Sequence, residues 1–123
     1  MLKKVFFIYK GKKFAINARS CNSFRKFIGL MFSRREKTEA LLFAFKKQVD
    51  FRIHSFFVFF PFVAVWLDEK NDVIEIKKVT PFTVSVRAKR PYKKLLEIPW
   101  SSRYRKNIKL LFPRVSPSVI RKI

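Results

Sequence analysis

The sequence predicts an α+β domain that is mostly β, built as a bent antiparallel sheet or small barrel with one amphipathic helix. Several short segments have strand-like patterns, one segment has helical spacing, and strands do not alternate with helices. The chain of 123 residues has the length of one domain. We expect residues 1–112 to form that single domain and residues 113–123 to be a loose C-terminal tail.

The N-terminal segment predicts a β-hairpin followed by the helix. Val5–Tyr9 and Phe14–Ala18 have strand-like apolar residues, and Gly11 between them supplies the turn. Four apolar residues then follow at positions i, i+3, i+4 and i+7 of one helical stripe: Phe24, Phe27, Ile28 and Met31. Ser33–Glu39 is predicted to be a charged loop.

An uncharged run, Ser55–Leu67, marks the core of the domain. It is shorter than the roughly 20 apolar residues that a membrane-spanning helix needs. It is also too continuous to be one face of an amphipathic element, so we expect protein on both sides of it. We predict two strand halves, Ile53–Phe60 and Phe62–Leu67, interrupted at Pro61 because proline cannot donate to a β-ladder. The phenylalanines are interpreted as core rather than as a lipid or ligand pocket.

The remaining elements are predicted from alternating hydrophobicity and from turn residues. Residues 68–72 form a hairpin tip, and Ser101 or Ser102 caps a short second helix of basic residues near Arg103–Asn107. The further predicted strands are Ala40–Phe45, Val73–Val79, Phe82–Arg87, Tyr92–Ile98 and Ile108–Phe112.

The net charge of +21 is concentrated at the two ends of the chain. Residues 1–37 contain 11 Lys or Arg against one acid, residues 38–86 contain six of each sign, and residues 87–123 contain 12 against one acid. The three segments therefore carry +10, 0 and +11. Such a balance favours polyanionic partners, namely RNA, DNA or an anionic membrane surface. The alternative explanation is an AT-rich genome, whose codons favour Lys and Phe, together with a solvated surface.

The basic C-terminal segment provides the best candidates for function. Lys and Arg would neutralise phosphates, and exposed aromatic rings would stack on unpaired bases. The candidate polyanion-binding residues are Arg87, Lys89, Arg90, Lys93, Lys94, Arg103, Arg105 and Lys106. The candidate stacking residues are Tyr92, Trp100 and Tyr104, for which the alternative is packing inside the protein. Because no recognised RNA-binding or helix-turn-helix motif is present, we expect low sequence specificity.

Motifs for catalysis and for cofactors are mostly absent. Two glycines are too few for a glycine-rich phosphate loop, and one cysteine with one histidine excludes a disulfide and a Cys/His zinc cluster. Cys21 and His54 could pair as nucleophile and base, but we favour a small buried cysteine. Asp68, Glu69 and Asp72 lack the spacing of a calcium loop and are interpreted as a solvated turn. We therefore expect no cofactor, no metal site, and binding rather than catalysis.

Two alternative functions stay open. In the first, the core sheet shapes a pocket for a small ligand or an enzymatic reaction, and the candidate polar groups are Arg34, His54, Asp68 and Glu75. In the second, the protein associates peripherally with an anionic membrane surface. The apolar stretch Val5–Tyr9 is shorter than the core of a signal peptide, which needs about 7–15 residues, so we expect a cytoplasmic protein.

An ordered series of motifs over about residues 14–99 resembles a known family. The motifs are GLMFSR at 29–34, LLFAF at 41–45, IHSFFVFFP at 53–61, VWLD at 65–68, VIEI at 73–76, TP at 80–81 and LLEIP at 95–99. On these motifs the chain resembles the domain-of-unknown-function 192 family and is most similar to its archaeal members. The resemblance implies a small, mostly β domain with no assigned biochemical activity, and bacterial relatives are often exported.

Two positions depart from the family pattern. Relatives typically have an aspartate two residues after the proline, where this chain has Val63. The glycine-containing C-terminal segment of the family is replaced by WSSR at residues 100–103. A function that depends on either feature does not carry over to this chain.

Overall fold

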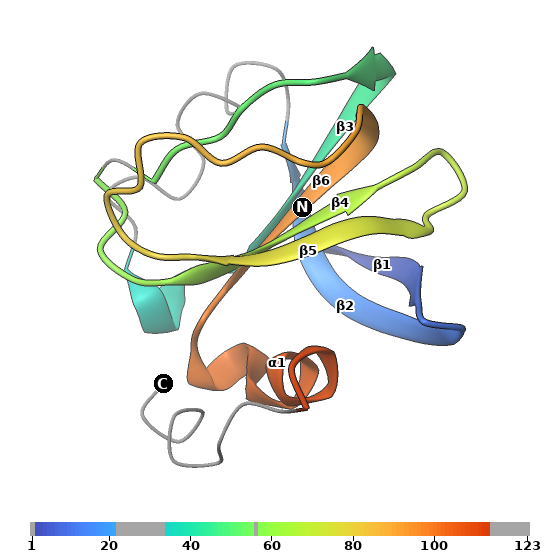
Figure 1. Ribbon diagram of the computed structural model, residues 1–123. Coiled ribbons are helices and arrows are strands. Elements are labelled where there is room, and N and C mark those ends of the chain that lie inside the picture. Colours follow the sequence, from blue (N-terminus) through green and yellow to red (C-terminus); the bar gives the residue numbers. More distant parts are fainter. Residues whose placement is uncertain (1, 22–33, 56, 114–123) are drawn as a thin grey trace.

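A computed structural model describes residues 2–21, 34–55 and 57–113. Six strands form one sheet in the order β1-β2-β3-β6-β4-β5, and a short helix lies beneath it (Figure 1). The elements are β1 (Leu2–Tyr9), β2 (Lys12–Cys21), the 3-10 helix η1 (Arg35–Lys37), β3 (Ala40–Val49), β4 (Phe62–Leu67), β5 (Val73–Val79), β6 (Tyr92–Pro99), the 3-10 helix η2 (Ser102–Tyr104) and α1 (Arg105–Leu111). The predicted mostly-β α+β class is confirmed.

The first two strands form the predicted hairpin. They pair antiparallel along their whole length, from Leu2 opposite Arg19 to Tyr9 opposite Lys12. The two-residue turn has positive φ at Lys10 (51°) and at Gly11 (76°). Two successive positive φ angles are typical of the type I′ turn, whose twist matches that of the flanking strands.

The sheet is mixed rather than antiparallel throughout. β3 pairs with β6, and β4 pairs with both β6 and β5, in antiparallel register. In contrast, β2 and β3 run parallel over a short stretch, from Ala18 opposite Ala40 to Cys21 opposite Phe43. Before Ala18, β2 diverges from β3 and leaves one of its edges open, and this open edge positions the C-terminal helix.

The sheet curls until its two outer strands approach each other. The backbone N–H of Ile8 in β1 donates to the carbonyl of Asn71, in the turn between β4 and β5, at 2.9 Å. The side-chain amide of Asn71 donates to the carbonyl of Phe6, also at 2.9 Å. These two bonds join opposite edges of the sheet and confirm the predicted bent, barrel-like shape.

The strand β4 is buried on both faces, as the uncharged run predicts. Its residues Val63, Val65 and Leu67 belong to an inner cluster with apolar residues of β1, β2 and α1. The alternate residues Phe62, Ala64 and Trp66 belong to an outer cluster beneath the connections that precede β4 and β6. Residues of opposite parity point to opposite faces of a strand, so one segment contributes to two apolar clusters.

Three predicted strands are wrong. Residues 53–55, 57–60 and 82–87 form no regular strand, and they share one isolated β-bridge, between Ile53 and Val86. The third predicted strand, Ile108–Phe112, is instead the last part of α1 and its C-cap residue Phe112. Tyr104, Ile108 and Leu111 are buried at the spacing of one helical face.

Two other predictions lie outside the described residues. These are the amphipathic helix over Phe24–Met31 and most of the C-terminal tail. Among the helices within the described ranges, none combines the length and the apolar character that crossing a bilayer requires.

Candidate polyanion interface

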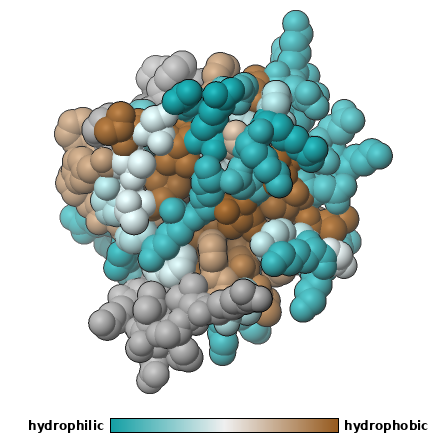
Figure 2. Space-filling model, in the orientation of Figure 1, coloured by the Kyte–Doolittle hydropathy of each residue, from teal (hydrophilic) through white to brown (hydrophobic). Residues whose placement is uncertain are grey.

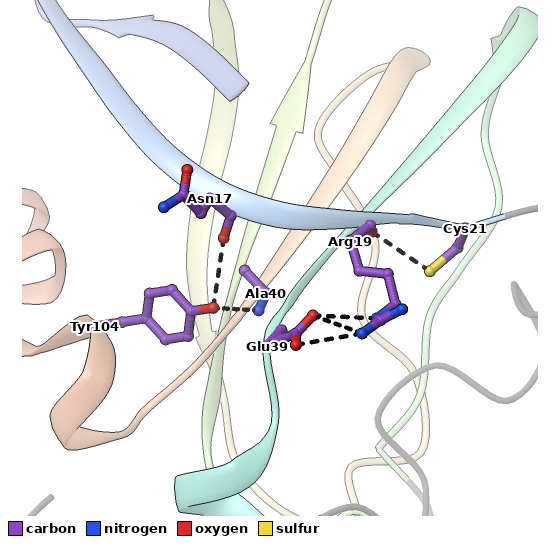
Figure 3. Close-up of polar contacts among 6 residues, drawn as sticks. All are labelled: Asn17, Arg19, Cys21, Glu39, Ala40 and Tyr104. Carbon is purple, nitrogen blue, oxygen red and sulfur yellow. Dashed lines mark hydrogen bonds and ion pairs between the residues drawn. The ribbon is translucent and has the colours of Figure 1, made fainter. Parts of the chain in front are cut away.

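The C-terminal helix is attached where β2 and β3 separate (Figure 3). The hydroxyl of Tyr104 accepts a hydrogen bond from the backbone N–H of Ala40 at 2.6 Å. The same hydroxyl donates to the carbonyl of Asn17 at 3.4 Å. Tyr104 is buried, so its ring joins the inner core while its hydroxyl bridges the two strands.

From this point α1 runs back along β2 toward the turn of the first hairpin. The side-chain amide of Asn107 donates to the carbonyl of Ala15 at 3.3 Å, two residues nearer the turn than Asn17. Ile108 and Leu111 pack in the inner cluster with Phe14 of β2. The helix α1 therefore lies against the N-terminal hairpin.

This packing places two separate groups of cations on neighbouring elements, β2 with its turn and η2 with α1. We define the turn–helix surface by seven exposed residues: Lys10, Lys12 and Lys13 of the hairpin, and Arg103, Arg105, Lys106 and Lys109 of η2 and α1. The sequence prediction included Arg103, Arg105 and Lys106 but missed the other four. The signal that could have found them is the acid-free run of residues 1–21, in which three lysines flank one glycine at the turn.

Carboxylates are scarce around the turn–helix surface. Residues 2–21 and 100–113 contain no Asp or Glu, and none of the seven cations forms an ion pair within the described part of the chain. Nearby Glu39 is paired with Arg19 at 3.0 Å. Glu36 accepts hydrogen bonds from the backbone N–H of Ser102 at 3.2 Å and from its hydroxyl. The surface is thus positive without internal neutralisation.

The eight predicted polyanion-binding residues do not form one site. Lys93 and Lys94 begin β6, whereas Arg103 and Arg105 lie beyond its other end, below the sheet (Figure 1). Eight extended residues span about 26 Å, because a strand rises about 3.3 Å per residue. This length separates Lys93 and Lys94 from Arg103 and Arg105. Lys94 nevertheless approaches the first hairpin, because its ammonium donates to Asn71 and the carbonyl of Asn71 accepts the N–H of Ile8, two residues before Lys10.

Several of the predicted cations on and before β6 already have partners within the protein. Arg87 pairs with Asp50 at 2.6 Å, and the hydrogen bond to this carboxylate raises the pKa of the guanidinium. The ammonium of Lys93 donates to the carbonyl of Lys46 at 2.9 Å. The ammonium of Lys94 donates to the side-chain oxygen of Asn71 at 2.6 Å. These contacts hold the cations against the sheet.

The three predicted stacking residues are buried. Tyr92, Trp100 and Tyr104 expose 1%, 3% and 5% of their surface. Tyr92 donates to the carbonyl of Phe51, and burial raises its pKa to about 12. The expectation that these rings are exposed to bases is wrong, and the alternative, that they are packed in the protein, is what the structure has.

The four predicted pocket residues are placed on different parts of the fold. Arg34 precedes η1, and His54 lies exposed in the irregular segment before β4. Asp68 accepts the N–H groups of Lys70 (2.8 Å) and Asp72 (3.0 Å), which is the turn chemistry expected of an aspartate. Glu75 accepts the N–H of Lys89 at 2.7 Å. These contacts do not bring the four groups to one centre.

A hollow of about 400 Å³ lies beside the β4–β5 turn. Its lining is polar and includes Asp68, Glu69, Asp72 and Arg90. Across the described ranges, no group of three or more His, Cys, Asp or Glu side chains has the arrangement that holds a metal ion.

Two further buried side chains, Cys21 and Glu97, carry groups that could react or titrate. Cys21 is buried, as favoured from the sequence, and its thiol points at the carbonyl of Arg19 at 3.7 Å. Glu97 is buried on β6 between Leu41 and Ala64, its register partners on β3 and β4. Loss of solvent raises the pKa of Glu97 to about 8, so this carboxyl is largely protonated at neutral pH.

The structure is a small curled β-sheet domain in which the basic hairpin β1–β2 packs against the basic segment of η2 and α1. The model of the DUF192 family, described as "Uncharacterized ACR", matches residues 9–110. The chain therefore belongs to the domain-of-unknown-function 192 family, as its motifs predict. A comparison with curated proteins finds no significant match.

Two solved structures share the fold. A protein of unknown function from Novosphingobium aromaticivorans is similar with a TM-score of 0.70 and 17% identity, over 85% of this chain and 77% of that one. A protein from Sinorhizobium meliloti, provisionally described as a transcription regulator, has a TM-score of 0.68 and 13% identity, over 83% of this chain and 81% of that one. At these identities the likeness supports the fold alone.

Proposed function

We propose that this protein is a non-catalytic binding module that holds the phosphate backbone of a nucleic acid on the turn–helix surface. The observation that carries the proposal is the contact of Tyr104 and Asn107 with β2. This contact supports the proposal because it places basic η2 and α1 beside the basic hairpin, although the contacting residues lie 87 and 92 positions apart in the sequence.

Binding would be electrostatic and weakly selective for sequence. Lysine and arginine neutralise phosphates and release condensed counterions, which gives affinity without reading bases. The aromatic rings that might have stacked on bases are buried. Exposed Phe6 and half-buried Tyr9 near the turn are each covered by a lysine, Lys13 at 4.6 Å and Lys10 at 5.3 Å from the ring centre. Recognition would therefore depend on charge rather than on stacking.

The proposal is tested by the anisotropy of a fluorescein-labelled poly(U) RNA titrated with protein at several salt concentrations. For seven phosphate contacts we expect log K to fall with log salt with a slope of about −5. The variant Arg105→Gln/Lys106→Gln/Lys109→Gln removes three of the seven cations from one exposed face. We expect weaker binding and a slope smaller by about 2.

A matched control removes the same charge elsewhere. The triple variant Lys46→Gln/Lys47→Gln/Lys89→Gln changes three exposed lysines on β3 and before β6. We expect this control to keep nearly the wild-type slope. Equal losses in the two variants would mean that only net charge matters, and no binding at low salt would mean that the nucleic-acid proposal is wrong.

A further inference from the structure

Three phenylalanines are exposed together on the connections that precede β4 and β6. Phe57, Phe59 and Phe82 expose 47%, 61% and 48% of their surface. The ring of Phe82 contacts Phe59 at 5.4 Å and Phe57 at 6.2 Å between centroids, both edge to face. Apolar side chains gather over these connections at the left of Figure 2. Solvent-exposed aromatic clusters mark interaction surfaces more often than scattered apolar residues do.

The backbone that presents these rings is strained. Phe57 and Phe82 have φ angles of 59° and 56°, in the left-handed region that favours glycine. In Thr80-Pro81-Phe82-Thr83 the proline precedes the left-handed residue, the pattern of a type II turn that normally has glycine in third place. Strain of this kind persists only where surrounding contacts determine the conformation.

Buried Ser55 supplies those contacts. Its hydroxyl donates to the carbonyl of Thr80 and accepts the N–H of Thr83, each at 2.6 Å. Its own N–H donates to the carbonyl of Thr83 at 3.0 Å. Its carbonyl accepts the N–H groups of Val58 at 3.1 Å and Phe82 at 2.9 Å. One side chain and its backbone therefore fix both turns, and we call Ser55, Phe57–Phe59 and Thr80–Thr83 the paired turns.

The charge around the paired turns indicates the kind of partner. The segments 51–60 and 80–86 contain no Asp or Glu, but they contain Arg52, which has no ion pair within the described part of the chain. Arg52 lies beside the turn, donating to the hydroxyl of Ser85 at 3.4 Å. A second copy of the chain would bring two such cations, and two net charges of +21, face to face. An anionic surface would not cause this repulsion between like charges.

We propose that the paired turns dock this protein peripherally on an anionic lipid bilayer. The phenylalanine rings enter the interfacial region, where aromatic side chains are favoured, and Arg52 remains at the level of the lipid headgroups. The pre-formed turns add no ordering penalty when they meet the membrane. This site is separate from the turn–helix surface and uses apolar insertion in addition to charge.

The test places a fluorescent probe at the tip. Both native tryptophans, Trp66 and Trp100, are buried, so they contribute a constant background. In a Phe59→Trp variant we expect the emission to shift to the blue with phosphatidylserine-containing vesicles, and lipids brominated near the headgroup end of the acyl chains to quench it. A Gln48→Trp variant, at an exposed position of β3 outside both proposed surfaces, is the matched control and should show neither effect.

Two further variants separate apolar insertion from binding by charge. A Phe57→Ser/Phe82→Ser variant should lose most of the vesicle binding that survives at high salt, because apolar insertion is not screened. The Arg105→Gln/Lys106→Gln/Lys109→Gln variant should keep the quenching even where it loses RNA binding. Sedimentation with vesicles without quenching of the Phe59→Trp probe would overturn the proposal, and so would the absence of sedimentation.

Discussion

The hydroxyl of Tyr104 accepts a hydrogen bond from the N–H of Ala40 at 2.6 Å, at the point where β2 and β3 begin to pair. Ala40 is buried, so this N–H has no access to water. A single side chain thereby closes the gap between two strands and fixes the beginning of α1. The arrangement of the basic surface depends on this contact.

Tyr104→Phe should lower the stability of the fold. The change removes one oxygen, leaves the ring in place and leaves the buried N–H of Ala40 unsatisfied. Such a group costs about 1–3 kcal/mol, which urea denaturation would measure as a lower midpoint. Tyr9→Phe is the matched control, because Tyr9 is only half-buried and its hydroxyl has no hydrogen bond within the described ranges. Equal stability of the two variants would contradict the bridging role.

Glu97 should make the protein more stable at acidic pH than at mildly alkaline pH. Its pKa is about 8 in the folded state and about 4.5 in a solvated chain. Between these values the unfolded state releases the proton and the folded state keeps it. Stability is therefore greatest below about pH 4.5 and falls by up to about 1.4 kcal/mol per pH unit until pH 8.

Glu97→Gln should remove that pH dependence. The uncharged amide has no proton to lose, so the variant should match the wild type near pH 5 and exceed it at pH 8 in urea denaturation. Glu75→Gln is the control, because Glu75 is partly exposed beside Lys77. A wild-type stability that does not change between pH 5 and pH 8 would show that the Glu97 carboxyl is solvated.

Phe82 and Phe59 form a matched pair for measuring backbone strain. Both rings are exposed and they contact each other, but only Phe82 has a positive φ. Replacing Phe59 by glycine adds chain entropy to the unfolded state, whereas replacing Phe82 also relieves left-handed strain. Phe82→Gly should therefore be more stable than Phe59→Gly by about 1 kcal/mol or more, by thermal or urea unfolding. The opposite order would mean that Phe82 is not strained.

The sequence predicted correctly the strands for which the hydrophobic pattern and the flanking turn residues indicate the same structure. Gly11 between two alternating segments gave the first hairpin, and Pro61 marked where β4 begins. The sequence did not predict the turns at Phe57 and Phe82. Nothing in the local sequence favours a left-handed conformation for a phenylalanine, and this conformation depends on hydrogen bonds of the distant Ser55. The strand predicted over Ile53–Phe60 therefore covered a segment that is not a strand and that exposes Phe57 and Phe59.

The candidate site was only partly predictable for a related reason. The two basic ends were visible in the sequence, but which cations would meet depended on the packing of α1 against β2. The segment Ile108–Phe112 was predicted as a strand, although the spacing of Tyr104, Ile108 and Leu111 fits a helix. That error hid the contact between Asn107 and Ala15, and with it the packing of α1 beside the hairpin lysines.

Val63 stands where the family resemblance places an aspartate, and its surroundings predict what restoring the acid would do. Val63 is fully buried in the inner cluster, with Ile98 and Lys78 as its register partners. A carboxylate here would lose its hydration, and its near neighbour of opposite charge, Lys78, has its ammonium over the ring of Trp100 at 4.2 Å. Val63→Asp should therefore destabilise the fold by about 3 kcal/mol or more at pH 7.

The destabilisation should be separable into lost packing and added charge. Val63→Ala removes the same apolar contacts without a carboxyl, so it should cost less and show no added pH dependence. In Val63→Asp, burial raises the pKa of the new carboxyl, and stability should recover as the pH falls toward 5. Adding Lys78→Ala should make Val63→Asp worse, because it removes the one cation beside the acid in the described sheet. If Lys78→Ala has no further effect, the buried acid does not use this lysine.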